Sequence, residues 1–138
     1  MDIHVATLCD AAVDYNGKLC VIGTFDQIFA RQVPVVHPQC ALALRVCFKP
    51  GDEGQHKLGI SFIDDDGKPV IRPFEPVMDV SLPPEGYFIT RNIVLNLQGM
   101  RFERPGQYEV QITFDGHVIT SIPLRVLLVM EGQGPQTS

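Results

Sequence analysis

The feature that most constrains the fold is a segment near the C-terminus in which apolar and polar residues alternate strictly. Residues 107–115 read QYEVQITFD, so every even position is apolar and every odd position is polar. This period of two is that of a β-strand with one buried and one solvated face, and it does not fit the 3.6-residue period of a helix. The segment therefore predicts an amphipathic strand.

The predicted strand runs into Asp115-Gly116, a pair typical of a two-residue hairpin turn. Residues 117–129 form the second arm, and the two arms are predicted to pair antiparallel. Pro123 lies within this second arm and has no N–H group to donate to a ladder. We therefore expect a bulge or an edge position at Pro123, with pairing resumed along residues 124–129.

Similar patterns recur along the chain between turn residues. Residues 3–9 and 18–25 flank Asn16-Gly17, a pair that accepts the positive φ angles of a tight hairpin turn. Residues 8–13 could also fit a short helix, but a strand is favoured because the segment leads directly into this turn. Further strands are predicted at residues 40–48, 58–62, 70–71, 77–82 and 87–97. These eight or nine strands predict an all-β, antiparallel two-sheet sandwich of immunoglobulin-like architecture.

Two connecting segments are predicted between the first hairpin and the strand at residues 40–48. Gln27 to Ala30 is predicted to be a short turn, capped by Asp26. Residues 33–38, VPVVHP, have the restricted dihedral angles of an extended connection, and we expect them to carry the chain from one sheet to the other. A single β-sandwich domain is expected over residues 1–130, followed by a disordered C-terminal tail, rich in Gly, Pro, Gln and Ser, at 131–138.

Charge and hydropathy limit the partners that the chain can bind. The chain of 138 residues carries a net charge of −5 and has a pI near 5.2, so its average surface repels phosphate backbones and anionic lipid headgroups. We expect neither a nucleic-acid partner nor a membrane partner. The first residues lack the basic and apolar regions of a signal peptide, and no apolar run approaches the ~20 residues that span a bilayer. A cytoplasmic localisation is therefore expected.

The cysteines lack the C-x-x-C spacing of zinc or redox sites and are interpreted as small buried hydrophobes: Cys9, Cys20, Cys40 and Cys47. A Cys9–Cys20 disulfide is the alternative. The register of the first hairpin places Cys20 opposite Val13 and Cys9 opposite Thr24, which leaves the two sulfur atoms apart.

Charged residues that could bind a metal have structural interpretations as well. Asp64, Asp65 and Asp66 precede Gly67 and could be imagined as a calcium loop, but three adjacent acids lack the alternating ligands of an EF-hand and fit an ordinary hairpin turn. The histidines are scattered and are expected at surface or edge positions: His4, His37, His56 and His117. We assign no catalytic, cofactor-binding or metal-binding residue and expect no cofactor.

Two further motifs indicate structural roles. Asp10 should face Gly23 across the first hairpin, which leaves its carboxylate room to accept backbone or hydroxyl hydrogen bonds. Residues 104–108, RPGQY, resemble the Pro-Gly-x-Tyr start of the penultimate strand in immunoglobulin-like sandwiches, where the tyrosine hydroxyl binds back to the preceding loop.

The last strand has apolar residues on both faces. Leu124, Val126, Leu128 and Met130 lie on one side, while Leu127 and Val129 lie on the other beside Arg125. Because one face of a small sandwich meets the core, the second apolar side requires a cover, either a loop or another chain. We therefore predict a homodimer, or another protein partner, through this apolar C-terminal strand.

Several segments together are similar to a known family. The first hairpin, with residues 8–10 and 16–26, the sequence DGKP at 66–69, and the closing segments PGQY at 105–108 and IPLRV at 122–126 resemble a bacterial family known only as a domain of unknown function. The resemblance covers nearly the whole chain. It implies a small cytoplasmic β-sandwich protein and no established activity, cofactor or functional residue.

The sequence favours a non-enzymatic protein-interaction or structural module, because sandwich edges and loops bind proteins and peptides. The alternative is small-molecule or carbohydrate binding in a cleft between the sheets or loops, around the aromatic residues Tyr15, Tyr87, Phe88 and Phe102. An enzyme is the third hypothesis, since a fold does not determine function, but no convergent acid, base and nucleophile can be named.

Overall fold

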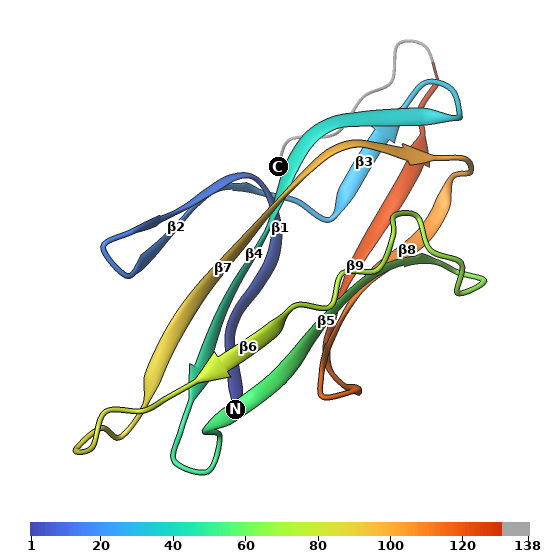
Figure 1. The fold of residues 1–138 in the computed structure, drawn as a ribbon. Helices are drawn as coiled ribbons and strands as arrows, with labels where there is room; N and C mark the ends of the chain where they lie inside the picture. Colours follow the sequence, from blue (N-terminus) through green and yellow to red (C-terminus); the bar gives the residue numbers. More distant parts are fainter. Residues whose placement is uncertain (131–138) are drawn as a thin grey trace.

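The fold is a sandwich of two β-sheets, seen in a computed structural model that describes residues 1–130 (Figure 1). The four-stranded sheet has the order β2-β1-β4-β7, with β1 at Asp2–Tyr15, β2 at Lys18–Thr24, β4 at Val35–Phe48 and β7 at Ile89–Phe102. The five-stranded sheet has the order β3-β9-β8-β5-β6, with β3 at Gln27–Ala30, β5 at Gly54–Asp64, β6 at Val77–Val80, β8 at Gly106–Phe114 and β9 at His117–Leu128.

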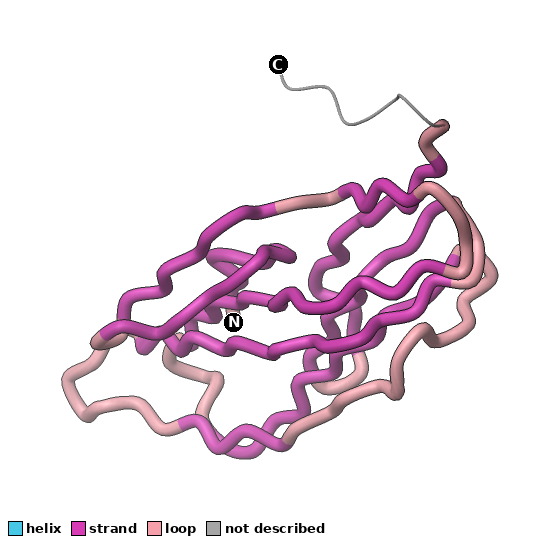
Figure 2. Tube along the Cα trace, turned by 90° about the horizontal axis from the view of Figure 1, so that it is seen from above, coloured by secondary structure: helices cyan, strands magenta, loops and turns pink. Residues whose placement is uncertain are grey.

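This architecture confirms the predicted immunoglobulin-like sandwich, with nine strands among the described residues. Strands and loops make up all of the described chain, and Figure 2 shows no helix in it. In this part of the chain there is accordingly no helix long and apolar enough to cross a membrane. The expected disorder of residues 131–138 lies outside the described residues.

The core lies between the sheets and is filled by alternate residues of the long strands. In β4, Leu42, Leu44 and Val46 are each at most 1% exposed, and each faces the five-stranded sheet as the period-two pattern predicts. The opposite sheet contributes side chains of the same kind, including Ile60, Phe62, Val110, Ile112, Leu124 and Val126. Burial of this apolar surface is the main favourable contribution to folding.

Both predicted hairpins turn at the expected residues. Asn16 and Gly17 have φ angles of 51° and 80°, while Asp115 and Gly116 have φ angles of 50° and 85°. Two successive positive φ angles are those of a type I′ turn, whose twist matches that of the paired strands. The strand interpretation of residues 8–13 is confirmed, because these residues belong to β1.

The β1–β2 hairpin leaves the plane of its sheet. β1 pairs with β4 from Asp2 to Cys9, and beyond Cys9 it pairs only with β2. Figure 1 shows the hairpin projecting from the body of the sandwich. A second apolar cluster lies beneath it on the outer face of the sheet, formed by the buried residues Cys9, Ala41 and Ala43, with Ala12, Leu19, Val21 and Val94 packed against them. The small alanine side chains allow this close approach.

Three segments differ from the prediction. Gln27 to Ala30 is not a turn but β3, which pairs parallel with β9 from Gln27↔Arg125 to Ala30↔Leu128. Ile28 and Ala30 are buried, so the segment has the alternation of a strand too short to be recognised alone. Residues 70–71 form no strand, although the neighbouring Pro69 makes an isolated bridge with Ile63. The extended crossover is also shorter than expected, because Val35 to Pro38 already belong to β4.

Pro123 lies at a local edge of the sheet, which is one of the two positions that the sequence predicts. β3 pairs with β9 only from Arg125 onward, so β9 has no neighbour on that side at Pro123. Pro123 pairs with Glu109 in register, and the bulge lies instead between Ile112 and Thr113. The N–H group of Arg125, two residues later, donates to the carbonyl oxygen of Asp26, which precedes β3. Residues two apart in a strand direct their N–H groups to the same side, so the nitrogen of Pro123 faces away from β8, where no ladder bond is lost.

The packing of the hairpin on the sheet can be tested by enlarging Ala43, which is fully buried beneath the hairpin. Ala43→Leu adds three carbon atoms where the hairpin contacts the sheet, so we expect the free energy of unfolding to fall by about 1–3 kcal/mol. Ala11→Leu is the matched control, because Ala11 is an exposed residue of the same hairpin and should change stability by less than about 0.5 kcal/mol. Chemical denaturation measures both, and equal effects of the two variants would contradict the packing described.

Candidate functional site

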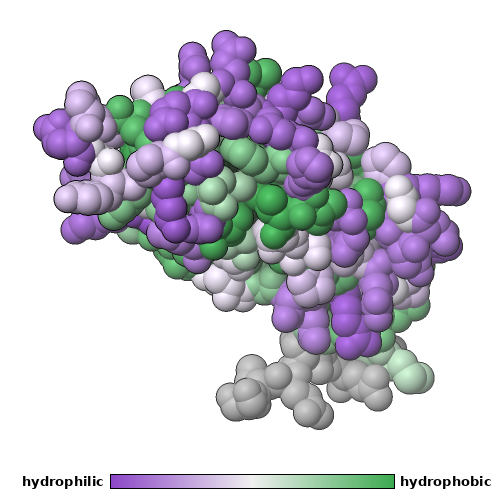
Figure 3. All heavy atoms as spheres, turned by 90° about the horizontal axis from the view of Figure 1, so that it is seen from below, coloured by the Kyte–Doolittle hydropathy of each residue, from purple (hydrophilic) through white to green (hydrophobic). Residues whose placement is uncertain are grey.

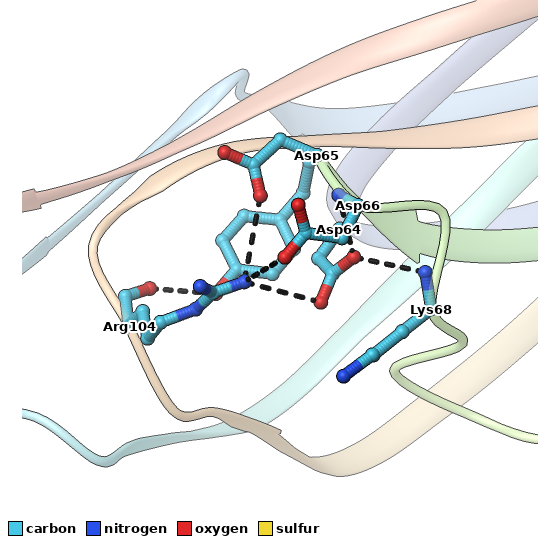
Figure 4. A network of polar contacts seen from close by, with 6 residues as sticks. Asp64, Asp65, Asp66, Lys68 and Arg104 are labelled. Atoms are coloured by element: carbon cyan, nitrogen blue, oxygen red, sulfur yellow. Dashed lines mark hydrogen bonds and ion pairs between the residues drawn. The ribbon is translucent and has the colours of Figure 1, made fainter.

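The first polar cluster lies in the loop after β5, where three successive carboxylates surround one guanidinium group (Figure 4). Nη2 of Arg104 lies 3.0 Å from Asp66 and 3.5 Å from both Asp64 and Asp65. Oxygen atoms of the three acids lie within 4.8 Å of one another, close enough to share a cation. The cation that they contact is the side chain of Arg104, which reaches across from the β7–β8 loop.

Asp64 also organises the backbone of this turn. Its Oδ1 accepts hydrogen bonds from the N–H groups of Asp66 and Lys68, each at 2.9 Å. These backbone donors, that of Lys68 first, lower the pKa of Asp64 below its usual value. The arrangement is that of a hairpin turn stabilised by its own aspartate, which agrees with the structural interpretation of the sequence.

The tyrosine motif is present as predicted. The hydroxyl of Tyr108 donates to the carbonyl oxygen of Arg104 at 2.6 Å, so the side chain binds back to the loop before β8. Its ring lies edge-on to Phe102 with the centroids 5.0 Å apart. Burial raises the pKa of the Tyr108 hydroxyl, which remains a neutral donor at physiological pH. Tyr108 therefore fixes the loop that carries Arg104.

The second polar cluster lies at the opposite end of the sandwich and is centred on His56. Its Nδ1 lies 2.7 Å from Oδ2 of Asp115, and its Nε2 lies 2.7 Å from the carbonyl oxygen of Asp52. Both partners are acceptors, so both ring nitrogens must carry a proton to make both hydrogen bonds. The ring also stacks on Phe114 with the centroids 4.6 Å apart. His56 as an imidazolium thus joins the β4–β5 loop to the β8–β9 turn.

The other histidines are not brought together. His4 and His117 are exposed, as expected. His37 is a correction to the surface assignment: it is partly buried against Phe25, with the ring centroids 5.5 Å apart, because it shares the inward-facing side of β4 with Val35. Its Nε2 is buried without a hydrogen-bond partner among the described residues.

All four cysteines are unpaired, and the predicted register is confirmed: Cys20 pairs with Val13 and Cys9 pairs with Thr24. Cys9, Cys40 and Cys47 are buried, and burial raises the pKa of the Cys40 thiol to about 11. Cys20 is a correction, because it is exposed. Its side chain lies on the hairpin face that points away from the sheet.

A polar network that sequence reasoning missed holds the tip of the hairpin. Nη1 of Arg45 donates to the carbonyl oxygen of Gly17 at 2.9 Å and to Oδ1 of Asn92 at 2.7 Å. The amide of Asn92 in turn donates to Asp14 and to Gly17, each at 3.1 Å. No local pattern predicts these hydrogen bonds of Arg45, because they depend on a hairpin that is distant in sequence.

The outer face of the hairpin is apolar and exposed. The side chains that point away from the sheet are those of Ala11, Val13, Tyr15, Lys18, Cys20 and Ile22. Val13, Tyr15 and Ile22 are 55%, 63% and 69% exposed. Lys18 carries the one charge among these six residues. Asp10 lies on the other face of the hairpin and covers Gly23 as predicted, and it is exposed to solvent.

The last strand is partly covered. Leu124 and Val126 are in the core, and β3 pairs with the strand from Arg125 to Leu128. Leu128 and Met130 remain 49% and 72% exposed, so the end of the chain's described part retains an apolar surface.

Of the aromatic residues expected around a cleft, Phe102 lies in a different environment from the other three. Phe102 is fully buried in the core, whereas Tyr15, Tyr87 and Phe88 are 63%, 86% and 59% exposed. The alternation at the end of β7 places Phe102 inward. Phe102 is therefore a correction, because a core residue cannot line this predicted binding site.

Two shallow hollows lie instead between the edges of the two sheets. One of about 280 Å³ is lined by Thr7, Thr24, Phe25, Asp26, Ile122 and Pro123. Another of about 510 Å³ lies at the start of β1 and is lined by Met1, Asp2, Ile3, His4, Ala6, Ile119 and Thr120. Figure 3 views the molecule from the end where β1 begins, and it shows hydrophobic side chains exposed in a band between polar regions.

A model of a family of unknown function, DUF6941, matches residues 4–127. The match confirms the resemblance to a family known only by its domain. No curated protein matches the sequence.

Two solved structures are similar in fold. One is the alkylpurine DNA glycosylase AlkC of Pseudomonas fluorescens bound to DNA containing an abasic site analog, with a TM-score of 0.50 and 12% identity over 90% of this chain. This chain spans 29% of the glycosylase, so the likeness shows the fold alone. The other is an immunoglobulin-like protein of Pseudomonas aeruginosa, with a TM-score of 0.43 and 10% identity, covering 87% of this chain and 91% of that one.

The charge state of His56 can be tested through the pH dependence of stability. The hydrogen bond to Asp115 raises the pKa of His56 above 6.5, and the same contact lowers the pKa of Asp115 below 3.8. The contribution of His56 is therefore complete below pH 6.5 and is lost as the pH rises through its folded pKa. The contribution of Asp115 is present above pH 3.8 and is lost in acid.

We expect wild type to exceed His56→Phe in free energy of unfolding by most near pH 5.5, well above the folded pKa of Asp115, and by less at pH 8.5. The phenylalanine variant keeps a ring that can stack on Phe114 and removes the titration. Urea denaturation across this range measures the difference, and a difference independent of pH would show that His56 does not bind as an imidazolium.

Proposed function

The chain belongs to the family of unknown function DUF6941, and from this premise we propose that the domain is a non-enzymatic protein-interaction module that binds through the outer face of its β1–β2 hairpin. The observation that carries the proposal is the exposure of Val13, Tyr15 and Ile22 on one face of the hairpin, at 55%, 63% and 69%. Contiguous exposed apolar side chains are typical of protein-binding surfaces.

The support beneath the hairpin favours binding. The tip is held by hydrogen bonds from Arg45 and Asn92, and the inward-facing residues Leu19 and Val21 pack on the apolar outer face of the sheet. A surface held in this way loses little conformational entropy when a partner binds, which preserves affinity. Tyr15 adds a large side chain with a polar tip, a residue type that is enriched among the strongest contacts of interfaces.

The two polar clusters support a non-enzymatic role, because their charged groups are already bound by other groups of the same chain. The acids around Arg104 and the ring of His56 have partners within the protein and stabilise loops at the two ends of the sandwich. The hairpin face presents its side chains to solvent. We further propose a cytoplasmic setting, because the exposed thiol of Cys20 would remain reduced there.

The apolar end of β9 is a second candidate surface for a protein partner, but not on the side that the sequence predicts, because Leu127 and Val129 are partly buried and the exposed side chains lie on the opposite side of the strand. Leu128 and Met130 supply its exposed side chains, and Phe29 of the neighbouring strand β3 is 37% exposed. Aspartate substitutions at Val13 and Leu128 separate the two surfaces.

The interaction surface is tested with Val13→Asp, which places a charge in the centre of the hairpin face. Tagged protein is used to capture partners from extract of the native cells, with an untagged copy of the chain added so that self-association is also detected. We expect Val13→Asp to reduce capture at least about 10-fold, equivalent to about 1.4 kcal/mol. Val77→Asp is the matched control, because Val77 is 60% exposed on β6 in the other sheet.

Capture that is lost with Leu128→Asp and kept with Val13→Asp would move the partner to the end of β9. Equal capture by wild type and all three variants, or no capture by wild type, would contradict the proposed function.

Small-molecule binding is the alternative function, and one observation favours it. The hollow of about 280 Å³ is lined by the aromatic residue Phe25 and by the polar residues Thr7, Thr24 and Asp26, a mixture of apolar and polar lining that is typical of ligand sites. A fragment and monosaccharide screen followed by amide NMR shifts tests it. Binding there should shift Thr24 and Asp26 and be weakened by Asp26→Ala, and a screen without such shifts would exclude this function.

A further inference from the structure

We infer that the free edge of β2 is a docking edge and that its occupant is β2 of a second copy of the chain, paired antiparallel about Cys20. The inference rests on the proposed function, because it names the partner of the same hairpin. It follows from a comparison of the sheet edges, from the direction of the backbone groups of β2 and from the charges that pairing would oppose.

Of the four strands that end the two sheet orders in the described chain, β2 is the least protected. Native edge strands are protected by short length, by charges or by irregular backbone. β3 and β6 contain four residues each. β7 carries Arg91 and Arg101 and has a positive φ angle of 63° at Gly99. β2 has seven residues, and Lys18 at its first position is its one charge.

The backbone of β2 offers a regular row of free groups. The hairpin closes on the pair Tyr15↔Lys18, and Val13↔Cys20 and Ala11↔Ile22 follow in register. In a hairpin with a two-residue turn, these alternate pairs exchange both of their N–H···O hydrogen bonds. The N–H and C=O groups of Leu19 and Val21 therefore point away from β1. Gly23, with a φ angle of 70°, ends the regular segment.

One antiparallel register uses all of these outward groups. A two-fold axis at Cys20 places Leu19 opposite Val21 of the second copy, and the reverse, which allows four hydrogen bonds. Registers displaced by two residues either leave Val21 without a partner or require the distorted Gly23. The pairing is isologous, as expected for a dimer with a two-fold axis.

The side chains in this register are compatible in charge. On the outer face Cys20 lies opposite its own copy, and Ile22 lies opposite Lys18 of the second copy, so no like charges face each other. The two Lys18 residues are separated by four residues along the pairing, about 13 Å, which exceeds a Debye length of about 8 Å. The hairpin faces of both copies then form one continuous apolar surface.

The expected dimer is weak and reversible. Two paired segments of five residues bury less than the roughly 1,200 Å² of total surface typical of stable complexes. Self-association should therefore depend on protein concentration, and a covalent probe at the axis is the sharpest test. Directly opposite residues of a non-hydrogen-bonded antiparallel pair have Cα atoms about 4.5 Å apart, within the range that a disulfide bridges.

The probe is diamide, which accepts two electrons and two protons from a pair of thiols as a disulfide forms. We expect it to link wild-type chains through Cys20, the exposed thiol, into a dimer that dithiothreitol reverses. Cys20→Ser should form none. The matched control combines Cys20→Ser with Val77→Cys, which places an exposed thiol on β6, and it should be linked at least about 10-fold more slowly, a difference of about 1.4 kcal/mol in barrier. Equal rates for the control and wild type would overturn the inference.

The register is tested without any thiol chemistry by changing the residue opposite Lys18. In a Cys20→Ser background at low salt, Ile22→Lys places two cations opposite each other twice in the dimer, whereas Ile22→Glu creates two opposite-charge pairs. Sedimentation equilibrium should show self-association reduced at least about 10-fold by the lysine and retained by the glutamate. Equal effects of the two variants would reject the pairing.

The outcomes separate this inference from the function on which it rests. Absent self-association together with Val13-dependent capture of another protein would overturn the pairing of β2 and leave the interaction module in place. Self-association that persists in Ile22→Lys and is lost in Leu128→Asp would assign the dimer to the end of β9 and overturn the pairing as well.

Discussion

The structure depends on the two faces of β4. Its inward-facing side chains, among them Leu42, Leu44 and Val46, fill the core between the sheets. Its outward-facing side chains, Ala41, Ala43 and Arg45, contact the β1–β2 hairpin and hold it on the sheet. The strand is paired along its whole length with β7, from Val35↔Phe102 to Phe48↔Ile89. One strand thus determines both the sandwich and the arm that lies outside it, because successive side chains point to opposite faces.

The sequence was sufficient where a local pattern determines local structure. The alternation of residues 107–115 and the Asn16-Gly17 and Asp115-Gly116 turns predicted strands, hairpins and even the pairing of Cys20 with Val13. It was insufficient where the partner of a segment lies far away in the chain. β3 is too short to be identified without β9, and its backbone groups are satisfied by a strand almost 100 residues later. The outward-facing alanines of β4 also had no meaning until the hairpin that covers them was known.

The candidate site shows the same division. The binding of Tyr108 to the preceding loop could be predicted because four residues contain the motif, whereas the contacts of Arg104 with three aspartates join loops about 40 residues apart. The exposure of Cys20 was missed because an apolar residue in a strand was assumed to be buried. In a hairpin that lies over a sheet, one face packs on the sheet and the other face remains in solvent. An apolar residue of such a strand can therefore be exposed. That outer face is where the proposed function is located.

Amide hydrogen exchange along β2 tests the account most directly. In dilute protein, where the chain is monomeric, the amides of Lys18, Cys20 and Ile22 should be protected by their bonds to β1, and those of Leu19 and Val21 should exchange rapidly from the free edge. Such alternation would establish an ordered arm with an unoccupied edge. Uniformly rapid exchange from Lys18 to Ile22 would mean that the contacts with β4 do not hold the hairpin in place. Uniform protection would mean that the edge of β2 is already covered within one chain.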